Sequence, residues 1–115
     1  MLTNKQSILS PKQNIAIAIA IELASHDGIL TVEQLAKQLN LSQSYVEQIT
    51  SMLRKGGVIT SVRGPGGGYL IDSQRITVRD VAIAMNDDAF NCDPTRKLYS
   101  RLESLMARLP INRLV

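Results

Sequence analysis

The polar residues best placed to do chemistry lie on one face of a helix predicted over residues 43–55. At about 100° per residue, the apolar Val46, Ile49 and Leu53 fall together on one side of this helix. The opposite side carries Ser44, Glu47, Gln48, Ser51 and Lys55, and Tyr45 and Met52 lie on a flank. Glutamine can pair with adenine, glutamate can accept from the cytosine amino group, and serine suits either. This face can therefore read base edges; the alternative is an ordinary solvated face.

A glycine-rich stretch follows that helix and can bring the backbone close to another surface. Its sequence is Arg63-Gly64-Pro65-Gly66-Gly67-Gly68-Tyr69, and it holds four of the seven glycines of the chain. Apolar runs over 58–62 and 69–71 flank it, so the pattern predicts a β-hairpin with a long, tight tip. Arg63 can enter a narrow groove of negative potential, as expected for the wing of a DNA-binding domain. The alternative is a surface turn without a partner.

Residues that commonly begin or end helices predict the bounds of the helices that position these side chains. Pro11 suits the first turn of a helix that ends near Asp27-Gly28. Thr31 and Gln34 match a capping box for a second, short helix. Ser42 can cap the helix that carries the polar face, and a Gly-Gly pair ends it. Two short helices so closely joined predict a helix-turn-helix, with the second helix as the reader.

A second helical region follows the hairpin. Thr77 can cap a helix over 78–86, and the acidic segment 86–94 leads to a last helix over 95–109. On this last helix, leucines recur at a four-three-four spacing: Leu98, Leu102, Leu105 and Leu109. The stripe predicts a dimerisation helix, and the alternative is packing against the chain's own core. A two-fold dimer would place two reader helices on successive faces of the major groove.

Composition narrows the remaining classes of function. The chain has 115 residues and 3% aromatic residues, which suits one domain with an aliphatic core. Its longest apolar run, residues 15–21, is too short to cross a membrane, so we expect a cytoplasmic protein without a membrane partner. The only His and the only Cys are far apart, and the glycine run lacks the Gly-Lys-Ser/Thr ending of a nucleotide-binding loop. These features argue against an enzyme.

The net charge of +3 is unevenly distributed along the chain. Residues 41–75 hold four cations and two carboxylates, residues 76–95 are acidic, and residues 96–115 are basic. The positive excess over the helix and the hairpin is a mild electrostatic footprint for nucleic acid.

These motifs together resemble a bacterial family of regulators, the Rrf-two family. The resemblance extends from the first helix to the last. Its most specific runs are Leu41-Ser42-Gln43-Ser44-Tyr45-Val46-Glu47-Gln48, Leu53-Arg54-Lys55-Gly56-Gly57-Val58-Ile59, residues 61–69, and Ile76-Thr77-Val78-Arg79-Asp80-Val81. The resemblance implies a mainly α fold with a small β-hairpin: a winged helix-turn-helix domain plus a C-terminal dimerisation helix. It also implies a homodimer that binds palindromic operators in double-stranded DNA, usually as a repressor.

By position, the resemblance assigns two sets of DNA contacts. In the reader helix these are Ser42, Ser44, Tyr45, Glu47 and Gln48. In the wing, residues 63–69, they are Arg63, Gly64, Gly66 and Gly67. The reader helix is then expected in the major groove and the wing in the minor groove.

One feature departs from the family pattern. Cluster-binding members hold an iron–sulfur centre with three cysteines in the loop before the dimerisation helix, whereas this chain has only Cys92 there. One thiolate per subunit cannot supply the four ligands that a cluster takes, so the sequence predicts no cofactor and no metal site. Three interpretations of Cys92 stay open: an inert residue, a redox thiol, or one ligand of an unconventional metal site. Neighbouring carboxylates at positions 87, 88 and 93 disfavour the reactive thiolate.

Along the chain we therefore expect a winged helix-turn-helix domain over 1–85, an acidic linker loop over 86–94, and a dimerisation helix and tail over 95–115. The predicted function is sequence-specific DNA binding by a dimeric transcriptional regulator that acts as a repressor. Two alternatives stay open: a winged-helix module that binds a protein partner without binding DNA, and a redox sensor that uses Cys92. An unknown effector is compatible with each.

Overall fold

Five helices and one hairpin make up the described part of the chain. The computed structural model describes residues 9–26, 28–64, 67–85 and 96–115. The helices are α1 (Pro11–His26), α2 (Val32–Leu39), α3 (Gln43–Lys55), α4 (Val78–Ala84) and α5 (Arg96–Ala107), and a 3-10 turn, η3 (Ile111–Leu114), follows α5. Strands β1 (Thr60–Val62) and β2 (Gly68–Leu70) pair antiparallel. This order confirms the predicted mainly α winged helix-turn-helix.

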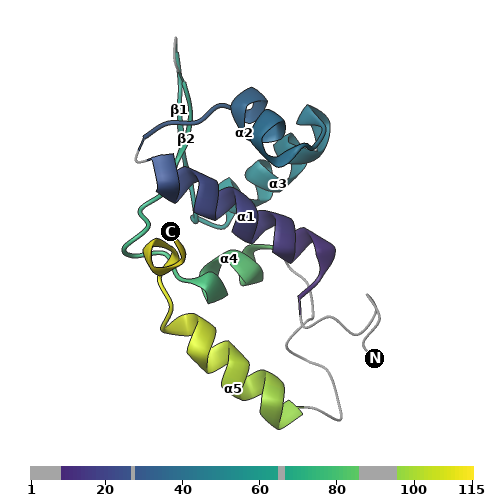
Figure 1. The fold of residues 1–115 in the computed structure, drawn as a ribbon, viewed down its shortest axis with the longest axis vertical. Helices are drawn as coiled ribbons and strands as arrows, with labels where there is room; N and C mark the ends of the chain where they lie inside the picture. Colours follow the sequence, from purple (N-terminus) through teal and green to yellow (C-terminus); the bar gives the residue numbers. More distant parts are fainter. Residues whose placement is uncertain (1–8, 27, 65–66, 86–95) are drawn as a thin grey trace.

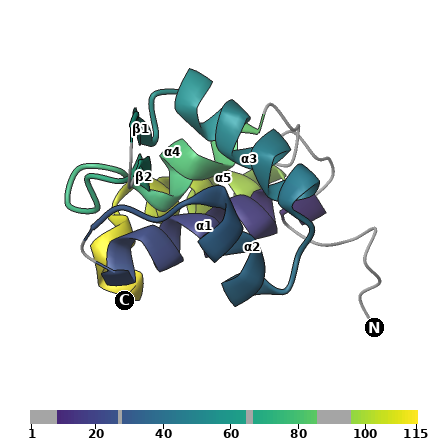
Figure 2. The ribbon, with the colours of Figure 1, turned by 90° about the horizontal axis from the view of Figure 1, so that it is seen from above.

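The hairpin and α5 lie at opposite ends of the molecule, with α1 crossing between them (Figure 1). The helix pair α2–α3 lies toward the same end as the hairpin. Seen from above, the hairpin stands to one side of α3 (Figure 2). The two elements predicted to contact DNA are therefore neighbours, and α5 is remote from them.

Local hydrogen bonds begin α2 and α4. Gln34 N donates to Thr31 Oγ1 at 3.0 Å and Thr31 N donates to Gln34 Oε1 at 2.9 Å, which confirms the predicted capping box. Thr77 caps α4 as predicted, and Asp80 completes a second box by accepting from Thr77 N at 2.9 Å. The α4 helix ends earlier than predicted, at Ala84.

The α5 helix also ends earlier than predicted, at Ala107 rather than at Leu109. Its last turn tightens, because Leu109 N donates to Met106 O three residues back. The following Pro110 disfavours helical dihedrals at Leu109, so the helix cannot continue through it.

The start of α1 contains a third capping box that the sequence analysis missed. Gln13 N donates to Ser10 Oγ at 3.1 Å, and Ser10 N donates to Gln13 Oε1 at 2.9 Å. Gln13 is fully buried, and its Nε2 donates to Ala82 O of α4 at 3.0 Å. The Gln13 side chain thus caps α1 and links it to α4. These hydrogen bonds satisfy the polar atoms of its buried amide.

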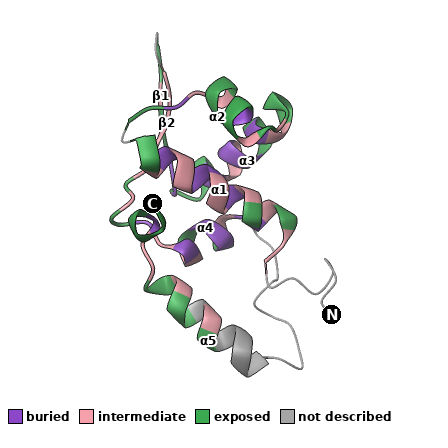
Figure 3. Ribbon diagram, viewed as in Figure 1, coloured by how far each residue is buried: buried purple, intermediate pink, exposed green. Residues whose placement is uncertain are grey.

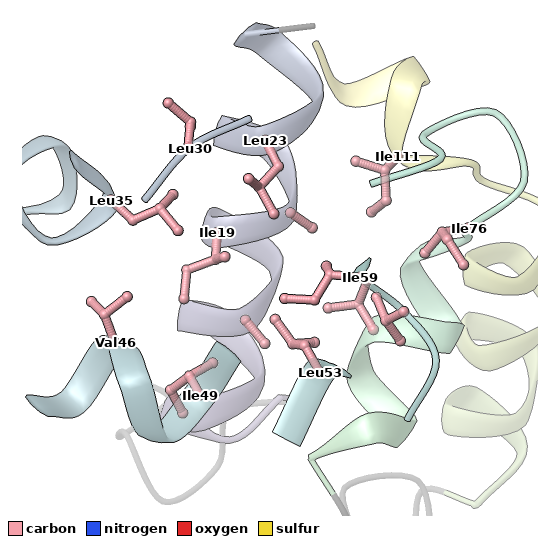
Figure 4. Close-up of a cluster of buried hydrophobic side chains, with 14 of the residues drawn as sticks. Ile19, Leu23, Leu30, Leu35, Val46, Ile49, Leu53, Ile59, Ile76 and Ile111 are labelled. Carbon is pink, nitrogen blue, oxygen red and sulfur yellow. The ribbon is translucent and has the colours of Figure 1, made fainter. Parts of the chain in front are cut away.

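The apolar core forms around α1 (Figure 4). Its Ile-Ala run buries Ala16, Ile19, Ala20 and Leu23 at helical spacing, so the two-residue alternation in the sequence is not a strand pattern. Facing them are Val46, Ile49 and Leu53 of α3, each 0% exposed, which confirms the predicted inner face of that helix. Among the described residues, no helix combines the length and hydropathy needed to cross a membrane.

The segment after α5 packs into this same core. Ile111 is fully buried, and its N–H donates to Ile76 O at 2.9 Å. On either side, Val78 N donates to Leu109 O and Asn112 N donates to Ser73 O. Residues 109–112, which the sequence analysis grouped with the dimerisation helix and tail, therefore run alongside residues 73–78 and anchor α5 to the winged helix.

Candidate nucleic-acid interface

The outer face of α3 presents three of the predicted base-reading side chains. Ser44, Glu47 and Gln48 are exposed, opposite the buried face of the helix (Figure 3). Ser42 begins the helix, and its Oγ accepts from Tyr45 N at 3.1 Å. Tyr45 is half-buried and packs against the core. The structure thus leaves three side chains fully available, while Ser42 and Tyr45 also fix the position of the helix.

The turn before α3 sets the direction of that face. Asn40 ends α2 in the left-handed conformation (φ 56°), and Leu41 N donates to Ala36 O at 2.9 Å. Within α3, the hydroxyl of the buried Thr50 donates to Val46 O at 2.9 Å, so its hydrogen-bonding capacity is satisfied. The tight turn and the buried face therefore hold α3 in one orientation against α2 and α1.

The wing is a hairpin whose register places Arg63 at the exposed end of β1. Ser61 pairs with Tyr69 and Val62 pairs with Gly68. Arg63 follows directly and is exposed. Gly64 has φ +98°, which favours glycine, and Gly67 N donates to Gly64 O at 2.8 Å to close the turn. The predicted hairpin is confirmed; Gly66, a predicted contact, lies outside the described residues.

The base of the wing is fixed by a contact that sequence analysis did not identify. Leu30, between α1 and α2, exchanges two backbone hydrogen bonds with Tyr69, at 3.0 and 2.8 Å. A Cβ at Gly68 would collide with the carbonyl of Leu30. β2 therefore lies between β1 and Leu30, and Gly68 allows this close approach at the wing's base. The signal was a fourth glycine directly before Tyr69, but nothing in the sequence named the opposing segment.

A short connection joins α3 to the wing, and its second half is buried. Gly56 ends α3, and Val58 N then donates to Leu53 O at 2.9 Å. Val58 and Ile59 are each 3% exposed and belong to the core. Because Val58 and Ile59 are buried, the core restrains the separation between the α3 face and Arg63.

The predicted leucine stripe is divided between two environments. Leu105 on α5 is 61% exposed, and Leu102 is half-buried. Leu109 lies beyond the end of α5 and packs against the core, as does Met106. The side chain of Leu98 lies outside the described part of the chain. The role of the stripe in dimerisation stays a prediction, and Leu105 is the most exposed of its described leucines.

These elements define a winged helix-turn-helix protein with a basic residue at its wing and a polar reader helix. The Rrf2 family model, described as an iron-dependent transcriptional regulator, matches residues 9–109. The chain belongs to the Rrf2 family, the Rrf-two regulators that its motifs resemble.

Relatives agree with this assignment. IscR of Photorhabdus laumondii, named an HTH-type transcriptional regulator, is 38% identical over 90 residues, which cover 73% of this chain and 55% of that protein. The chain thus spans about half the length of the curated relatives it matches. The structure of T. potens IscR has a TM-score of 0.75 at 26% identity and covers 92% of this chain and 85% of its own. These relatives are named as regulators, not enzymes.

The fold is also similar to that of CymR, described as the global cysteine regulator of B. subtilis. The TM-score is 0.78 at 24% identity, over 99% of this chain and 96% of CymR. This likeness extends through α5 and the tail, so it supports the architecture of the whole described chain.

The donors of this chain do not fit a cluster held by three thiolates. Its only cysteine is Cys92, which lies with the acidic segment 86–94 outside the described residues. Within the parts that the structure describes, no group of three or more His, Cys, Asp or Glu side chains could hold a metal ion. The only histidine, His26, is exposed at the end of α1 and hydrogen-bonded to Gln38 at 3.2 Å. One thiolate is therefore too few for a cluster of this kind.

Proposed function

We propose that this protein is a sequence-specific DNA-binding transcriptional regulator that acts in the cytoplasm. α3 enters the major groove and the wing reaches the adjacent minor groove. One observation carries the proposal: α3, whose polar side chains are exposed, lies toward the same end of the molecule as the hairpin that carries Arg63, and the buried Val58 and Ile59 connect the two. This arrangement suits a rigid two-part contact with a duplex.

The side chains on α3 supply complementary base contacts. Gln48 can pair with adenine through its amide, and Glu47 can accept a hydrogen bond from the cytosine amino group. Ser44 can donate or accept, and Ser42 can still donate its O–H to a phosphate because only its oxygen serves the cap. Specificity thus comes mainly from α3, and Ser42 and Tyr45 position it.

The cations near this face supply the non-specific part of the affinity. Arg54 and Lys55 are exposed at the end of α3, and Arg63 is exposed at the wing. Glu47 on the reader face opposes them with one negative charge. We expect affinity to fall steeply with added salt, because each neutralised phosphate releases counterions.

The proposal includes a homodimer that represses transcription from palindromic sites. The exposed Leu105 on α5 supports it, because a large apolar side chain at this end of the molecule suits a partner surface. Two copies joined through α5 would present two α3 helices to half-sites about one helical turn apart.

The test is binding of the full chain to genomic DNA fragments from its native host, followed by footprinting. At low salt we expect a small subset of fragments to be retarded, with two protected major-groove stretches roughly 10 base pairs apart. A single protected stretch would contradict the dimer. No retardation of any fragment would remove the DNA-binding function and favour a module that binds a protein partner.

A further inference from the structure

A groove of about 650 Å³ lies between the C-terminal end of α3 and α4. One wall is formed by Met52, Lys55 and residues 56–58. The other is formed by residues 75, 76, 79, 80, 83 and 84. Of the cations proposed to attract DNA, only Lys55 lines it, and none of the side chains proposed to read bases or to form the wing does. Its volume is within the range of about 300–1,000 Å³ that is usual for small-molecule sites.

The walls of this groove are predominantly cationic. Three cations line it: Lys55 at the end of α3, Arg79 on α4, and Arg75 in the segment before α4. Arg75 forms an exposed ion pair with Asp72, at 3.6 Å between Nε and Oδ2. Asp80 is the one carboxylate among the described lining residues, and its Oδ2 accepts from Thr77 N at the start of α4. The lining therefore holds three cations against one carboxylate, and Asp72 outside it offsets part of the charge of Arg75.

The groove also has an apolar part that a phosphate backbone would not cover. Ile83 on α4 is 42% exposed, although its neighbours Val81 and Ala82 are fully buried. Met52 of α3 lines the groove with it and is half-buried. Cations beside exposed apolar side chains match a ligand that has both a negative head and an apolar body.

We propose that this groove binds a small organic anion with an apolar body, either a carboxylate or a phosphate monoester. Arg75, Arg79 and Lys55 hold the anionic head, and the body covers Ile83 and Met52. The site adjoins the Gly56-Gly57 segment between α3 and the wing, where a ligand of a regulator can act on both elements. Binding to this groove does not depend on the proposed DNA-binding function.

The test uses the full chain without DNA and four probes in calorimetry: hexanoate, hexyl phosphate, the neutral hexanamide and inorganic phosphate. We expect saturable binding of hexanoate or hexyl phosphate, whichever matches the head group, and much weaker binding of hexanamide and inorganic phosphate. NMR signals of the Ile83 and Met52 methyl groups should shift on binding. Equal binding of inorganic phosphate, or no saturable binding by either amphipathic probe, would overturn the proposal.

Substitutions in the groove test whether the ligand binds there. Arg75→Gln with Arg79→Gln should weaken binding roughly tenfold or more, because charged hydrogen bonds are lost. Ile83→Glu should do the same by repulsion, and the fold should tolerate it because Ile83 is already exposed. The matched control is Arg113→Gln, an exposed cation outside the groove. Unchanged affinity in the first two variants, or an equal loss in the control, would contradict this location.

Discussion

The wing and α5 project from opposite ends of the molecule, and they are attached by different physical means (Figure 1). β2 of the wing is hydrogen-bonded on both sides, to β1 and to Leu30, and Gly68 allows the close approach. α5 is attached by Met106, which packs against the core, and by the segment after it, where Ile111 is buried and residues 109–112 pair with residues 73–78. The wing is held close to Leu30 because Gly68 has no side chain, whereas α5 is anchored by the buried side chain of Ile111.

Ile111→Ala gives the largest expected effect, because it removes the buried anchor of α5. We expect a loss of roughly 2–5 kcal/mol in the free energy of unfolding, since the cavity opens in a packed core. Chemical denaturation measures this loss. The control is Leu114→Ala, three residues on and 38% exposed, which should cost far less. Equal costs would show that the tail does not anchor the core.

Gly68→Ala tests the wing's attachment in the same way. The added Cβ meets the Leu30 carbonyl, so the bridge between Leu30 and Tyr69 must shift, at a cost of about 1–3 kcal/mol. Gly28→Ala is the matched control, because its Cβ would meet the nearest atom at an ordinary 3.6 Å. Thermal unfolding and amide exchange at Tyr69 give the readout. If amide exchange at Tyr69 is unchanged, the wing is not held by Leu30.

Gln48→Ala tests base recognition by α3 without changing how the helix packs in the fold. The side chain is exposed, so stability should stay within about 0.5 kcal/mol. Base preference at one position of each half-site should relax by roughly 1–3 kcal/mol if the contact is bidentate. Binding to a set of singly substituted operators measures this. A preference profile identical to the parent's would mean that another face of α3 reads the bases.

Arg63→Ala should weaken DNA binding by a smaller and more uniform amount. The exposed guanidinium at the end of β1 contributes charge rather than base recognition. We expect the slope of affinity against salt to fall by about 1, with little change in base preference. Arg101→Ala on α5, remote from the wing, is the control. A salt slope that matches the parent's would take the wing out of the contact.

Leu105→Ser should have the smallest effect on the folded chain. The residue is 61% exposed, so the free energy of unfolding of the monomer should change by no more than about 0.5 kcal/mol. The dissociation constant of the dimer should rise, as measured by analytical ultracentrifugation. Leu114→Ser, an exposed leucine outside α5, is the control. A dimer as tight as the parent's would place the interface elsewhere.

Features set by neighbouring residues were predictable from sequence. The Thr31–Gln34 box, the Ser42 cap and the buried face of α3 follow from spacings of three or four residues. The hairpin followed from its glycines and its apolar flanks. Contacts across the chain were not predictable: Gln13 with Ala82, Leu30 with Tyr69, and the tail with residues 73–78. No local pattern specifies which distant backbone a strand or a buried amide will meet.

The same division applies to function. The sequence alone determined the exposed polar face of α3 and the hairpin, because helical periodicity and glycine chemistry act locally. It also determined that the chain has one cysteine where a cluster held by three thiolates requires more. Only the tertiary structure decided that Gly68 serves the wing's base and that Leu109 faces the core. The groove likewise exists only because folding brings Lys55 and Arg79 together. Because the interior is close-packed, the partner of each buried group depends on how the whole core packs together.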